Sequence, residues 1–327
     1  MLRTPPPTVL MALLLAGAML PGCSRPQPDD ADATAGATAA PGPVAAGDVQ
    51  AEAARETSAD AFRFNIGALD AVALKDGDID AANDGKTFAI GQPAEQVATL
   101  LAAAGAPTDV LHLSIQPLLV RGGERVLLFD TGAGNVAWAR GGRLPASLDA
   151  GGVQPSQVTD VFISHLHADH VGGLLTSGGT LAFPDATVHL SAPEWAAMQA
   201  DPNAAALVAA IRPKVAAFEP GAELVPGMVT AVVDDGHTPG HSAYLITSGD
   251  ERLLYIGDTA HHFVVSVQRP EWTIAYDTDA SLAERHRREL LQRAADENTR
   301  VYAVHFPFPG LGRFEARDGN FVWVPEA

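Results

Sequence analysis

Three histidines and one aspartate fall within six positions of residues 164–173, Ser-His-Leu-His-Ala-Asp-His-Val-Gly-Gly, although the whole chain has only 11 histidines. The segment follows the apolar run Val-Phe-Ile at 161–163, which is typical of a buried strand. Imidazoles placed side by side would repel one another if all were protonated, so something must hold them neutral. A bound metal ion does so. We therefore expect this strand to end at a metal site.

The spacing within the segment sends its side chains in two directions. His165 and His167 lie two residues apart and project to the same side of an extended chain, where both can bind one cation. Asp169 and His170 emerge from the following turn in a different direction, which suits a second metal ion. The glycines at 172 and 173 are expected to let the backbone start a helix close to the site.

Three other loops carry candidate ligands. His237 and His241 follow the predicted strand 229–233, Asp258 follows the predicted strand 253–256, and His305 ends the predicted strand 301–304. Each lies at the C-terminal end of an apolar run, where a sheet presents functional groups to a crevice. The recurrence of four such loops favours one shared site over isolated structural histidines.

Charge excludes one class of partner. The chain of 327 residues has 21 Lys and Arg against 39 Asp and Glu, a formal net charge of −18. Nucleic-acid binding needs clustered basic side chains that release counterions, so we expect no nucleic-acid partner. Hydrophobic residues make up 47% of the chain, enough for a large core. The sequence also allows a homodimer.

The N-terminus has the three parts of an export signal. Arg3 precedes a 12-residue apolar run at 9–20, which is too short to cross a bilayer, and small residues follow. The run ends Leu-Pro-Gly-Cys23, which resembles the lipobox of bacterial lipoproteins, so residues 1–23 are predicted to be a lipoprotein-type signal peptide. The expected location is the periplasm, with lipidated Cys23 as the only membrane anchor. Ser24 favours the outer membrane by the family rule, and cleavage by the ordinary signal peptidase is the alternative.

Composition divides the remaining chain into a tether and one domain. Residues 24–61 are rich in Ala, Pro and Gly and cannot bury enough apolar surface to order themselves, so they are predicted to be disordered. From 62 to 327, strands alternate with helices, which predicts an α/β arrangement. The expected strands are 62–66, 69–74, 111–120, 125–129, 158–163, 187–190, 229–233, 244–247, 253–256 and 301–304. The expected helices are 193–200, 203–217 with an interruption at Pro213, and 281–296. The last helix should bury a leucine stripe and turn its arginines to water.

These motifs resemble the metallo-β-lactamase superfamily over about residues 62–327. The resemblance implies a four-layer αββα sandwich with a dinuclear metal site at one edge. It implies that His165, His167 and His237 bind one metal ion, that Asp169, His170 and His305 bind the other, and that Asp258 bridges both. Asp130 matches an acid that supports the ligand geometry without binding metal, and His241 matches a non-ligand position beside the pocket.

Asp258 separates branches of the family. True β-lactamases carry cysteine or serine at the matching position, whereas dinuclear esterases and lactonases carry aspartate. The stretches 148–155, 277–279, 305–312 and 321–325 look like methyl parathion hydrolase and its lactonase-like relatives. The pair His261–His262 departs from that hydrolase, and either lines the pocket or is solvated.

The resemblance implies a metallo-hydrolase that uses a metal-bridging hydroxide on a small neutral lactone or ester, with phosphotriesters as a further substrate class. Asp169 or Asp258 would take up or relay a proton. Zn²⁺ is the favoured metal, with Mn²⁺ or Fe as alternatives. An apolar pocket is expected from Trp195, Met198, Phe263, Phe306 and Phe308. The competing interpretations are a β-lactamase, a glyoxalase II-like thioesterase, and a non-catalytic metal-binding lipoprotein.

Overall fold

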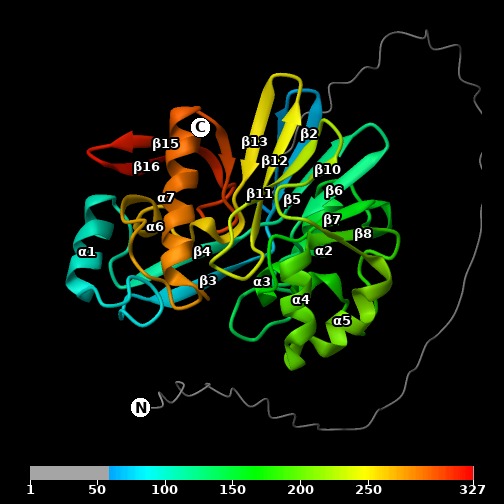
Figure 1. Cartoon of the computed structure of the whole chain (residues 1–327), viewed down its shortest axis with the longest axis horizontal. Coiled ribbons are helices and arrows are strands. Elements are labelled where there is room, and N and C mark those ends of the chain that lie inside the picture. Colours follow the sequence, from blue (N-terminus) through cyan, green and yellow to red (C-terminus); the bar gives the residue numbers. More distant parts are fainter. Residues whose placement is uncertain (1–58, 327) are drawn as a thin grey trace, which may run out of the picture. The chain divides into compact units, whose positions relative to one another are not determined.

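The structure, a computed structural model, describes residues 59–326 (Figure 1). The predicted signal peptide and residues 24–58 of the predicted tether lie outside the described residues. Strand β1 begins at Ala61, one residue before the predicted start of the domain. Among residues 59–326, no helix is both long and apolar enough to span a bilayer.

Two seven-stranded sheets form the centre of the domain. The first sheet has the order β1-β2-β5-β6-β7-β8-β9, with β1 (Ala61–Ile66), β2 (Leu69–Leu74), β5 (Leu118–Gly122), β6 (Arg125–Phe129), β7 (Asp160–Phe162), β8 (Thr187–Ser191) and β9 (Val215–Phe218). Its strands from β6 to β9 run parallel, so their carboxyl ends meet at one edge. That edge is where the first histidine segment emerges.

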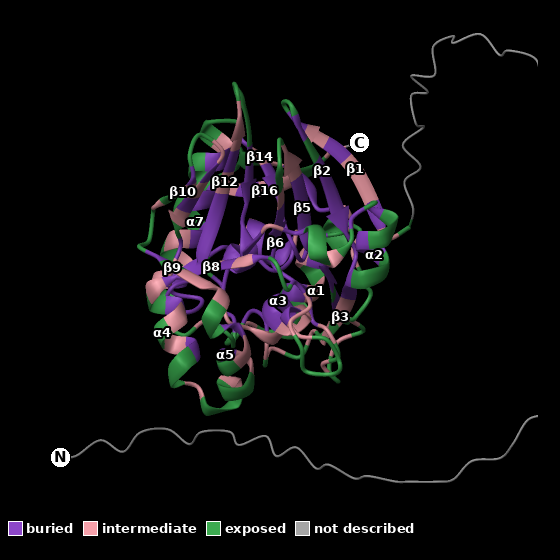
Figure 2. Cartoon of the chain, turned by 90° about the vertical axis from the view of Figure 1, so that its right-hand side faces the viewer, coloured by how far each residue is buried: buried purple, intermediate pink, exposed green. Residues whose placement is uncertain are grey.

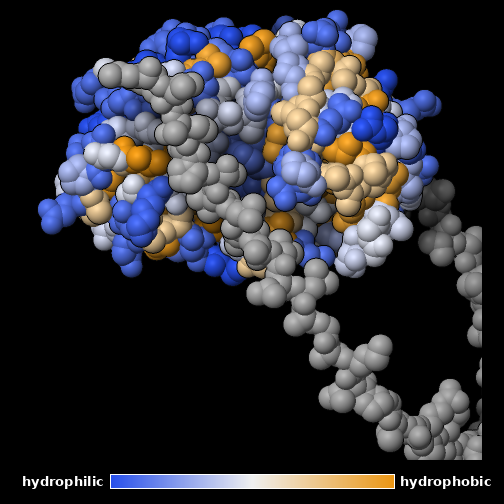
Figure 3. Space-filling view, turned by 60° about the horizontal axis from the view of Figure 1, so that its bottom comes forward, coloured by the Kyte–Doolittle hydropathy of each residue, from blue (hydrophilic) through white to orange (hydrophobic). Residues whose placement is uncertain are grey.

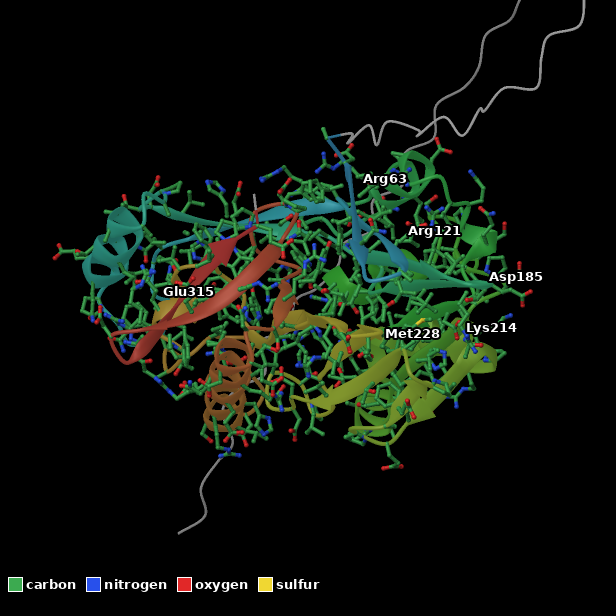
Figure 4. All side chains as sticks on the ribbon, turned by 90° about the horizontal axis from the view of Figure 1, so that it is seen from above. Arg63, Arg121, Asp185, Lys214, Met228 and Glu315 are labelled. Carbon is green, nitrogen blue, oxygen red and sulfur yellow. The ribbon has the colours of Figure 1, made fainter. Side chains whose placement is uncertain are left out.

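The second sheet runs in chain order from β10 to β16. Its strands are β10 (Glu223–Val225), β11 (Val229–Val233), β12 (Ser242–Ser248), β13 (Glu251–Tyr255), β14 (Arg300–Tyr302), β15 (Leu311–Arg317) and β16 (Asn320–Pro325). A separate antiparallel pair joins β3 (Gly77–Ala82) to β4 (Val110–Ile115). Figure 4, seen from above, labels Arg121 of β5 and Met228, which lies just before β11, on the two facing sheets.

Seven α-helices accompany the sheets: α1 (Ala94–Ala103), α2 (Leu144–Ala150), α3 (Ala168–Val171), α4 (Ala192–Ala200), α5 (Ala205–Ile211), α6 (Val265–Gln268) and α7 (Ala280–Asp296) among the described residues. Figure 1 shows α7 beside β11 and β13, and α4 and α5 beside β7 and β8. In Figure 2 the buried residues concentrate on the strands, and the exposed residues lie on the outer helix faces and loops.

Alternating side chains explain why the central strands are apolar throughout. In β6, Leu127 and Phe129 enter the core between the sheets, whereas Leu128 points to the core beneath α2, α4 and α5. Because successive strand residues face opposite sides, a strand buried on both faces needs a continuous apolar run. A third core packs Leu290 and Leu291 of α7 against the second sheet. The first core lies between the two sheets, the second between the first sheet and helices α2, α4 and α5, and the third between the second sheet and α7. The layers are therefore helix, sheet, sheet and helix, which confirms the predicted αββα sandwich.

Two predicted elements were wrong in extent. The expected interruption of helix 203–217 at Pro213 is confirmed, because proline lacks the N–H and the space that a helix interior requires, but the helix ends at Ile211 and does not resume. The chain then forms a 3₁₀ turn and the edge strand β9. The predicted strand 111–120 is two strands, β4 and β5, separated at Gln116 and Pro117. Sequence periodicity also missed α1, β3 and the final hairpin of β15 and β16.

The exposed apolar surface of the domain forms several patches. The large hydrophobic side chains exposed among the described residues are Ile90, Trp138, Val233, Tyr276 and Val324. On the face shown in Figure 3, hydrophobic residues gather in one larger patch at the right and in smaller patches among hydrophilic ones. Of these side chains, Tyr276 is the one with a recorded contact to the histidine cluster.

Candidate metal centre

All seven predicted ligands converge at the edge where the strands end. They come from the segments that follow β7, β11, β13 and β14, and they fall into two clusters of potential ligand atoms. The first group is His165, His167 and His237 with Asp258, and the second group is Asp169, His170 and His305. The ligand atoms within each group lie within 4.8 Å of one another. Loops separated by up to 140 residues therefore meet, as predicted from their positions after strands.

In the first group, ring nitrogens converge on one point. Nδ1 of His167 lies 2.9 Å from Nε2 of His165 and 3.0 Å from Nε2 of His237. Two nitrogens bound to one tetrahedral Zn²⁺ at 2.0–2.1 Å would lie roughly 3.3 Å apart. The three rings already stand close to that separation, so a small outward shift would admit a cation.

The second group pairs two imidazoles with a carboxylate. Oδ2 of Asp169 lies 3.6 Å from Nε2 of His170 and 3.4 Å from Nε2 of His305. All three side chains are buried. Two neutral nitrogens and one anionic oxygen are a donor set that suits Zn²⁺, Mn²⁺ and Fe.

Asp258 lies between the two groups and turns one oxygen to each. Its Oδ2 is 3.3 Å from Nε2 of His237 and 3.6 Å from Nε2 of His165. Its Oδ1 is 3.1 Å from Nε2 of His170 and 3.0 Å from Nε2 of His305. One carboxylate that faces both clusters has the geometry required to bridge two cations.

The outward nitrogens of the rings are fixed by the protein. Nδ1 of His170 donates to Oδ2 of Asp130 at 2.7 Å, and Nδ1 of His305 donates to the carbonyl oxygen of Ser114 at 2.7 Å. Each bond keeps one ring proton outside the cluster, so Nε2 is the nitrogen that faces inward and is left to bind a cation. Nε2 of His170 and Oδ1 of Asp258 are buried atoms without a hydrogen-bond partner within residues 59–326. Unsatisfied inward-facing ligand atoms of this kind fit bound metal ions.

In one part of the site, burial and neighbouring charges favour the protonation states that bind metal. Burial, together with the His170 ring, lowers the pKa of His165 well below its usual value, and burial lowers the pKa of His167 to about 3. Burial opposes ionisation of Asp258, but His170 and His305 hold the pKa of its carboxyl well below the usual range. Neutral rings beside an ionised carboxylate are ready to ligate a cation.

His237, His170 and His305 behave differently before a cation binds, because neighbouring carboxylates outweigh burial and raise the pKa of each ring. For His237, burial disfavours the charged form, but the carboxylates of Asp258 and Asp277 outweigh this effect and raise the pKa of His237 to about 9. A metal ion must displace that proton, so metal affinity is expected to weaken as the pH falls.

Asp130 takes the supporting position expected for it. Its Oδ1 accepts from the backbone N–H of Ser164, and its Oδ2 accepts from the hydroxyls of Ser164 and Tyr255 as well as from His170, each at 2.7 Å. Asp130 follows β6 with a φ of 57°, in the left-handed region where Asp is tolerated. It thereby ties the start of the histidine segment to both sheets.

His241 lies outside both groups. Its Nε2 accepts the backbone N–H of Asp258 at 2.9 Å, and its Nδ1 lies 3.0 Å from Oδ2 of Asp234. His241 therefore orients the loop of the bridging aspartate, which agrees with its predicted place beside the pocket.

His261 and His262 are both buried, so they are not a solvated pair. Nε2 of His261 lies 3.1 Å from Oδ2 of Asp258, and both of its ring nitrogens lack hydrogen-bond partners in the described part of the chain. His262 instead turns away, and its Nδ1 accepts the N–H groups of Val264 and Val265 at the start of α6. His261 thus borders the site, and His262 has a structural role.

The expected apolar pocket residues mostly belong to the core. Met198 and Phe306 are buried in the cores beneath α4 and α7, and Trp195, Phe263 and Phe308 pack against core clusters. The aromatic neighbours of the site are two residues that the sequence did not single out. Phe88 meets the His261 ring at 6.0 Å between centroids, and Tyr276 meets the His167 ring at 6.2 Å.

Arg287 corrects the expectation that the arginines of α7 face water. It is 1% exposed, and its Nε donates to the carbonyl oxygen of Thr259 at 2.8 Å. Its Nη2 donates to Oδ2 of Asp277 at 3.0 Å, while Oδ1 of Asp277 accepts from Nδ1 of His237 at 2.9 Å. Arg287 therefore connects α7 to two of the ligand loops.

The glycines after the histidine segment also have a different role from the expected one. Helix α3 begins at Ala168, before them. A Cβ on Gly172 would lie 2.3 Å from the carbonyl oxygen of Ala133, and one on Gly173 would lie 2.0 Å from that of Thr131. These positions need glycine because the 131–133 backbone passes against them.

Comparisons with known proteins agree with this geometry. The family model described as metallo-beta-lactamase superfamily matches residues 113–305. No match was found among curated proteins. The chain is similar to the solved structure of AidC, described as a dizinc quorum-quenching lactonase in complex with the product N-hexanoyl-L-homoserine, with 29% identity and a TM-score of 0.78. That alignment covers 82% of this chain and 98% of AidC.

Two further structures extend the likeness. The hydrolase AbOPH, described as in the beta lactamase superfamily, is 30% identical with a TM-score of 0.75, over 83% of this chain and 99% of that one. A probable metal-dependent hydrolase from Staphylococcus aureus is 21% identical with a TM-score of 0.66, over 80% and 99% of the two chains, and shows the fold alone. The chain therefore belongs to the metallo-beta-lactamase superfamily and is a metallo-hydrolase of that fold.

Proposed function

We propose that this metallo-hydrolase uses two metal ions to hydrolyse a neutral lactone or ester. The observation that supports this proposal most directly is the placement of Asp258, with one carboxylate oxygen facing each ligand group. In this assignment His165, His167 and His237 hold one ion, and Asp258 is shared. The second ion is held by Asp169, His170 and His305.

Two divalent cations would supply Lewis acidity and a water of lowered pKa. The chain's own residues would position and protect the reacting groups. His170 and His305 keep their protons on Nδ1 through the bonds to Asp130 and Ser114, so their ring orientations are set before substrate arrives. Such preorganisation means that little rearrangement is required during the reaction.

Asp169 is the better placed of the two carboxylates for moving a proton. Its side chain is 10% exposed, whereas that of Asp258 is 4% exposed with both oxygens facing histidines. A proton accepted by Asp169 can therefore pass to the leaving oxygen or to solvent. His261, with unpartnered ring nitrogens beside Asp258, is available to hydrogen-bond an oxygen of the substrate.

A neutral acyl substrate fits the surroundings of the site. Phe88 and Tyr276 present aromatic rings next to His261 and His167. Arg287 is committed to Asp277 and to backbone carbonyls, so it is not free to bind a substrate anion. The product recorded for AidC is an N-acylated homoserine, and we extend that chemical class to this chain.

A substrate panel tests the proposal. The metal-loaded full chain would be assayed against N-acyl-homoserine lactones, aryl esters, paraoxon-type phosphotriesters and nitrocefin, with chelator-treated protein as the control. We expect lactone or ester turnover that chelator abolishes. Phosphotriester turnover would add the further substrate class, whereas activity confined to nitrocefin would contradict the assignment.

Metal identity requires its own measurement. Nitrogen and oxygen donors without thiolate suit Zn²⁺ but also Mn²⁺ and Fe, and the AidC structure is described as dizinc. We propose Zn²⁺, at about two equivalents per chain. Elemental analysis of protein purified without added metal would check this, and a dominant content of another metal would overturn it.

We also propose that the N-terminus exports the protein and that Cys23 carries a lipid. The proposal rests on the sequence of residues 1–23, which lie outside the described part of the chain. Metabolic labelling with a fatty acid should mark the wild type but not Cys23→Ala, and fractionation should place the wild type with membranes. Label-free, soluble periplasmic protein would instead indicate ordinary cleavage.

A further inference from the structure

Glu194 is a fully buried carboxylate that the proposed chemistry does not use. It lies in the first turn of α4, where Ser191 caps the helix, and it is 0% exposed. An ionised side chain in such a place is costly unless several donors satisfy it. Within residues 59–326, the three groups that donate hydrogen bonds to its carboxylate all lie outside α4.

Each oxygen of Glu194 holds a different ligand loop. Oε1 accepts the backbone N–H of Leu166 at 2.7 Å, and Leu166 stands between His165 and His167. Oε2 accepts the hydroxyl of Thr238 and the backbone N–H of Gly240, both at 2.8 Å, just after His237. One carboxylate therefore joins the turn of two first-group histidines to the loop of the third.

The packing of Gly240 is an independent sign of the same junction. A Cβ at Gly240 would lie 2.2 Å from Oγ of Ser191 and 2.4 Å from the backbone nitrogen of Glu194. The hydroxyl of Ser191 also donates to the carbonyl oxygen of Gly240 at 2.6 Å. The His237 loop is thus docked on the N-terminus of α4, and only a glycine allows this approach.

The partners of Glu194 are suited to its ionised form. Burial raises the pKa of Glu194, but the bonds from Thr238, Leu166 and Gly240 oppose that effect. Two of these partners are backbone N–H groups, which cannot accept a proton from a carboxylic acid. The start of a helix also favours a negative charge.

We propose that Glu194 is a positioning residue for the first metal ion: by joining the His165–His167 turn to the His237 loop, it sets the affinity of the first ligand group. This inference rests on the proposed pair of metal ions. The second group is positioned by other residues, because His170 is held by Asp130 and His305 by Ser114. Loss of Glu194 should therefore lower the affinity for the first metal ion and leave the affinity for the second unchanged.

Glu194→Gln tests the proposal because it keeps the shape of the side chain but places an amide N–H₂ where an acceptor is needed. The variant would be made in two backgrounds of the full chain. His305→Ala removes a ligand of the second group, and His167→Ala removes one of the first. The fraction of the remaining Zn²⁺ that stays bound would then be measured at increasing chelator concentrations, without any substrate.

The expected result is selective. In the His305→Ala background, Glu194→Gln should lower the affinity of the remaining ion by roughly 10-fold, as is typical when a supporting partner of a metal ligand is lost. In the His167→Ala background, Glu194→Gln should leave the affinity unchanged. Equal losses in both backgrounds would indicate general loosening and would overturn the proposal, as would no loss in either.

Two further sets of variants address folding. Asp160→Asn removes another buried carboxylate, one bonded to Arg125, His189 and Thr159 rather than to ligand loops. It should lower thermal stability without changing the affinity for either ion. If Glu194→Gln fails to fold, Thr238→Val removes a single bond to Glu194 and should show a smaller effect with the same selectivity.

These results separate the inference from the proposed function. A wild-type chain that binds no metal would overturn both. A wild-type chain that binds two ions but hydrolyses no lactone or ester would contradict the substrate assignment. The role of Glu194 would still be decided by the chelator measurement. If each of the two ions binds with the same affinity to wild type and to Glu194→Gln, only the positioning role is overturned.

Discussion

The two ligand groups are supported by different layers of the sandwich. His237 of the first group is held by Asp277, which in turn is held by Arg287 of helix α7. In the second group, His170 is held by Asp130 at the end of β6, and His305 by the backbone of Ser114 in β4. Helix α7 therefore supports His237 of the first group, whereas strand residues support the second group. Asp130 also reaches His165 of the first group through the hydroxyl of Ser164.

This difference suggests that the two metal ions differ in how easily they are lost. Asp130 bonds Ser164 after the first sheet and Tyr255 on the second sheet, so both sheets must move before it can. Helices α4 and α7 pack on the outside of the sheets and can shift against them at lower cost. We expect the first group to release its ion before the second.

Asp258→Ala should have the largest effect because it removes the one residue that both groups share. Its oxygens face His237 on one side and His305 on the other. We expect turnover to fall by about 10³-fold, comparable to the loss of a main charge-stabilising group. Steady-state kinetics with the lactone or ester would measure this, and an active variant with two ions bound would remove the bridging role.

His167→Ala and His305→Ala break one group each. Each should reduce the metal content from about two equivalents to about one and lower turnover strongly, because the remaining ion cannot form the bridged pair. Elemental analysis after gel filtration gives the count. If either variant lost both ions, the two groups would be one cooperative site and the comparison between them would fail.

Asp130→Asn and Asp277→Asn change the supports without touching the ligands' own atoms. Asp277→Asn should weaken the first-group ion by roughly 10-fold, and Asp130→Asn should weaken the second-group ion by roughly 100-fold. Asp130→Asn should also weaken the first-group ion to a smaller extent, because Ser164 joins Asp130 to His165. Asp130→Asn should have the greater effect because Asp130 accepts from Ser164, His170 and Tyr255 together. Chelator titration would rank them, and the reverse order would contradict the greater rigidity of the strand side.

The candidate ligands could be found in the sequence because their signals are local. His165, His167 and His170 stand in one short segment, and Asp258 and His305 directly follow apolar strand runs. The ends of the strands converge in any sandwich of this kind. The position of each candidate residue after a strand was therefore enough to place it at the site without knowledge of distant contacts. The αββα layering was predictable from the family resemblance of the same motifs.

The supporting residues could not be predicted in the same way. Glu194 bonds residues 28 to 46 positions away, and in the sequence it is an acidic residue in a first helical turn, where acids are common on the surface. Arg287 stands among other arginines of α7, and only the packing of α7 shows which one is buried. The false helical extension to 217 arose because short apolar runs such as Val215–Phe218 fit helix and strand equally.

His262→Asn has the smallest expected effect and changes a buried histidine that supports neither ligand group. Burial lowers the pKa of His262 to about 3 from its usual 6.5, and its Nδ1 accepts the first N–H groups near α6. Between pH 6.5 and 3 the unfolded chain binds the proton that the folded chain excludes. The free energy of unfolding should therefore fall with falling pH across this window, by about 1.4 kcal/mol per pH unit.

Asparagine keeps an acceptor for those N–H groups but does not titrate. Urea unfolding of chelator-treated protein at pH 6.5 and pH 5 should show the wild type losing about 2 kcal/mol more than His262→Asn, from the same slope per pH unit. An equal fall in the free energy of unfolding in wild type and variant would show that protonation of His262 does not weaken the fold at low pH.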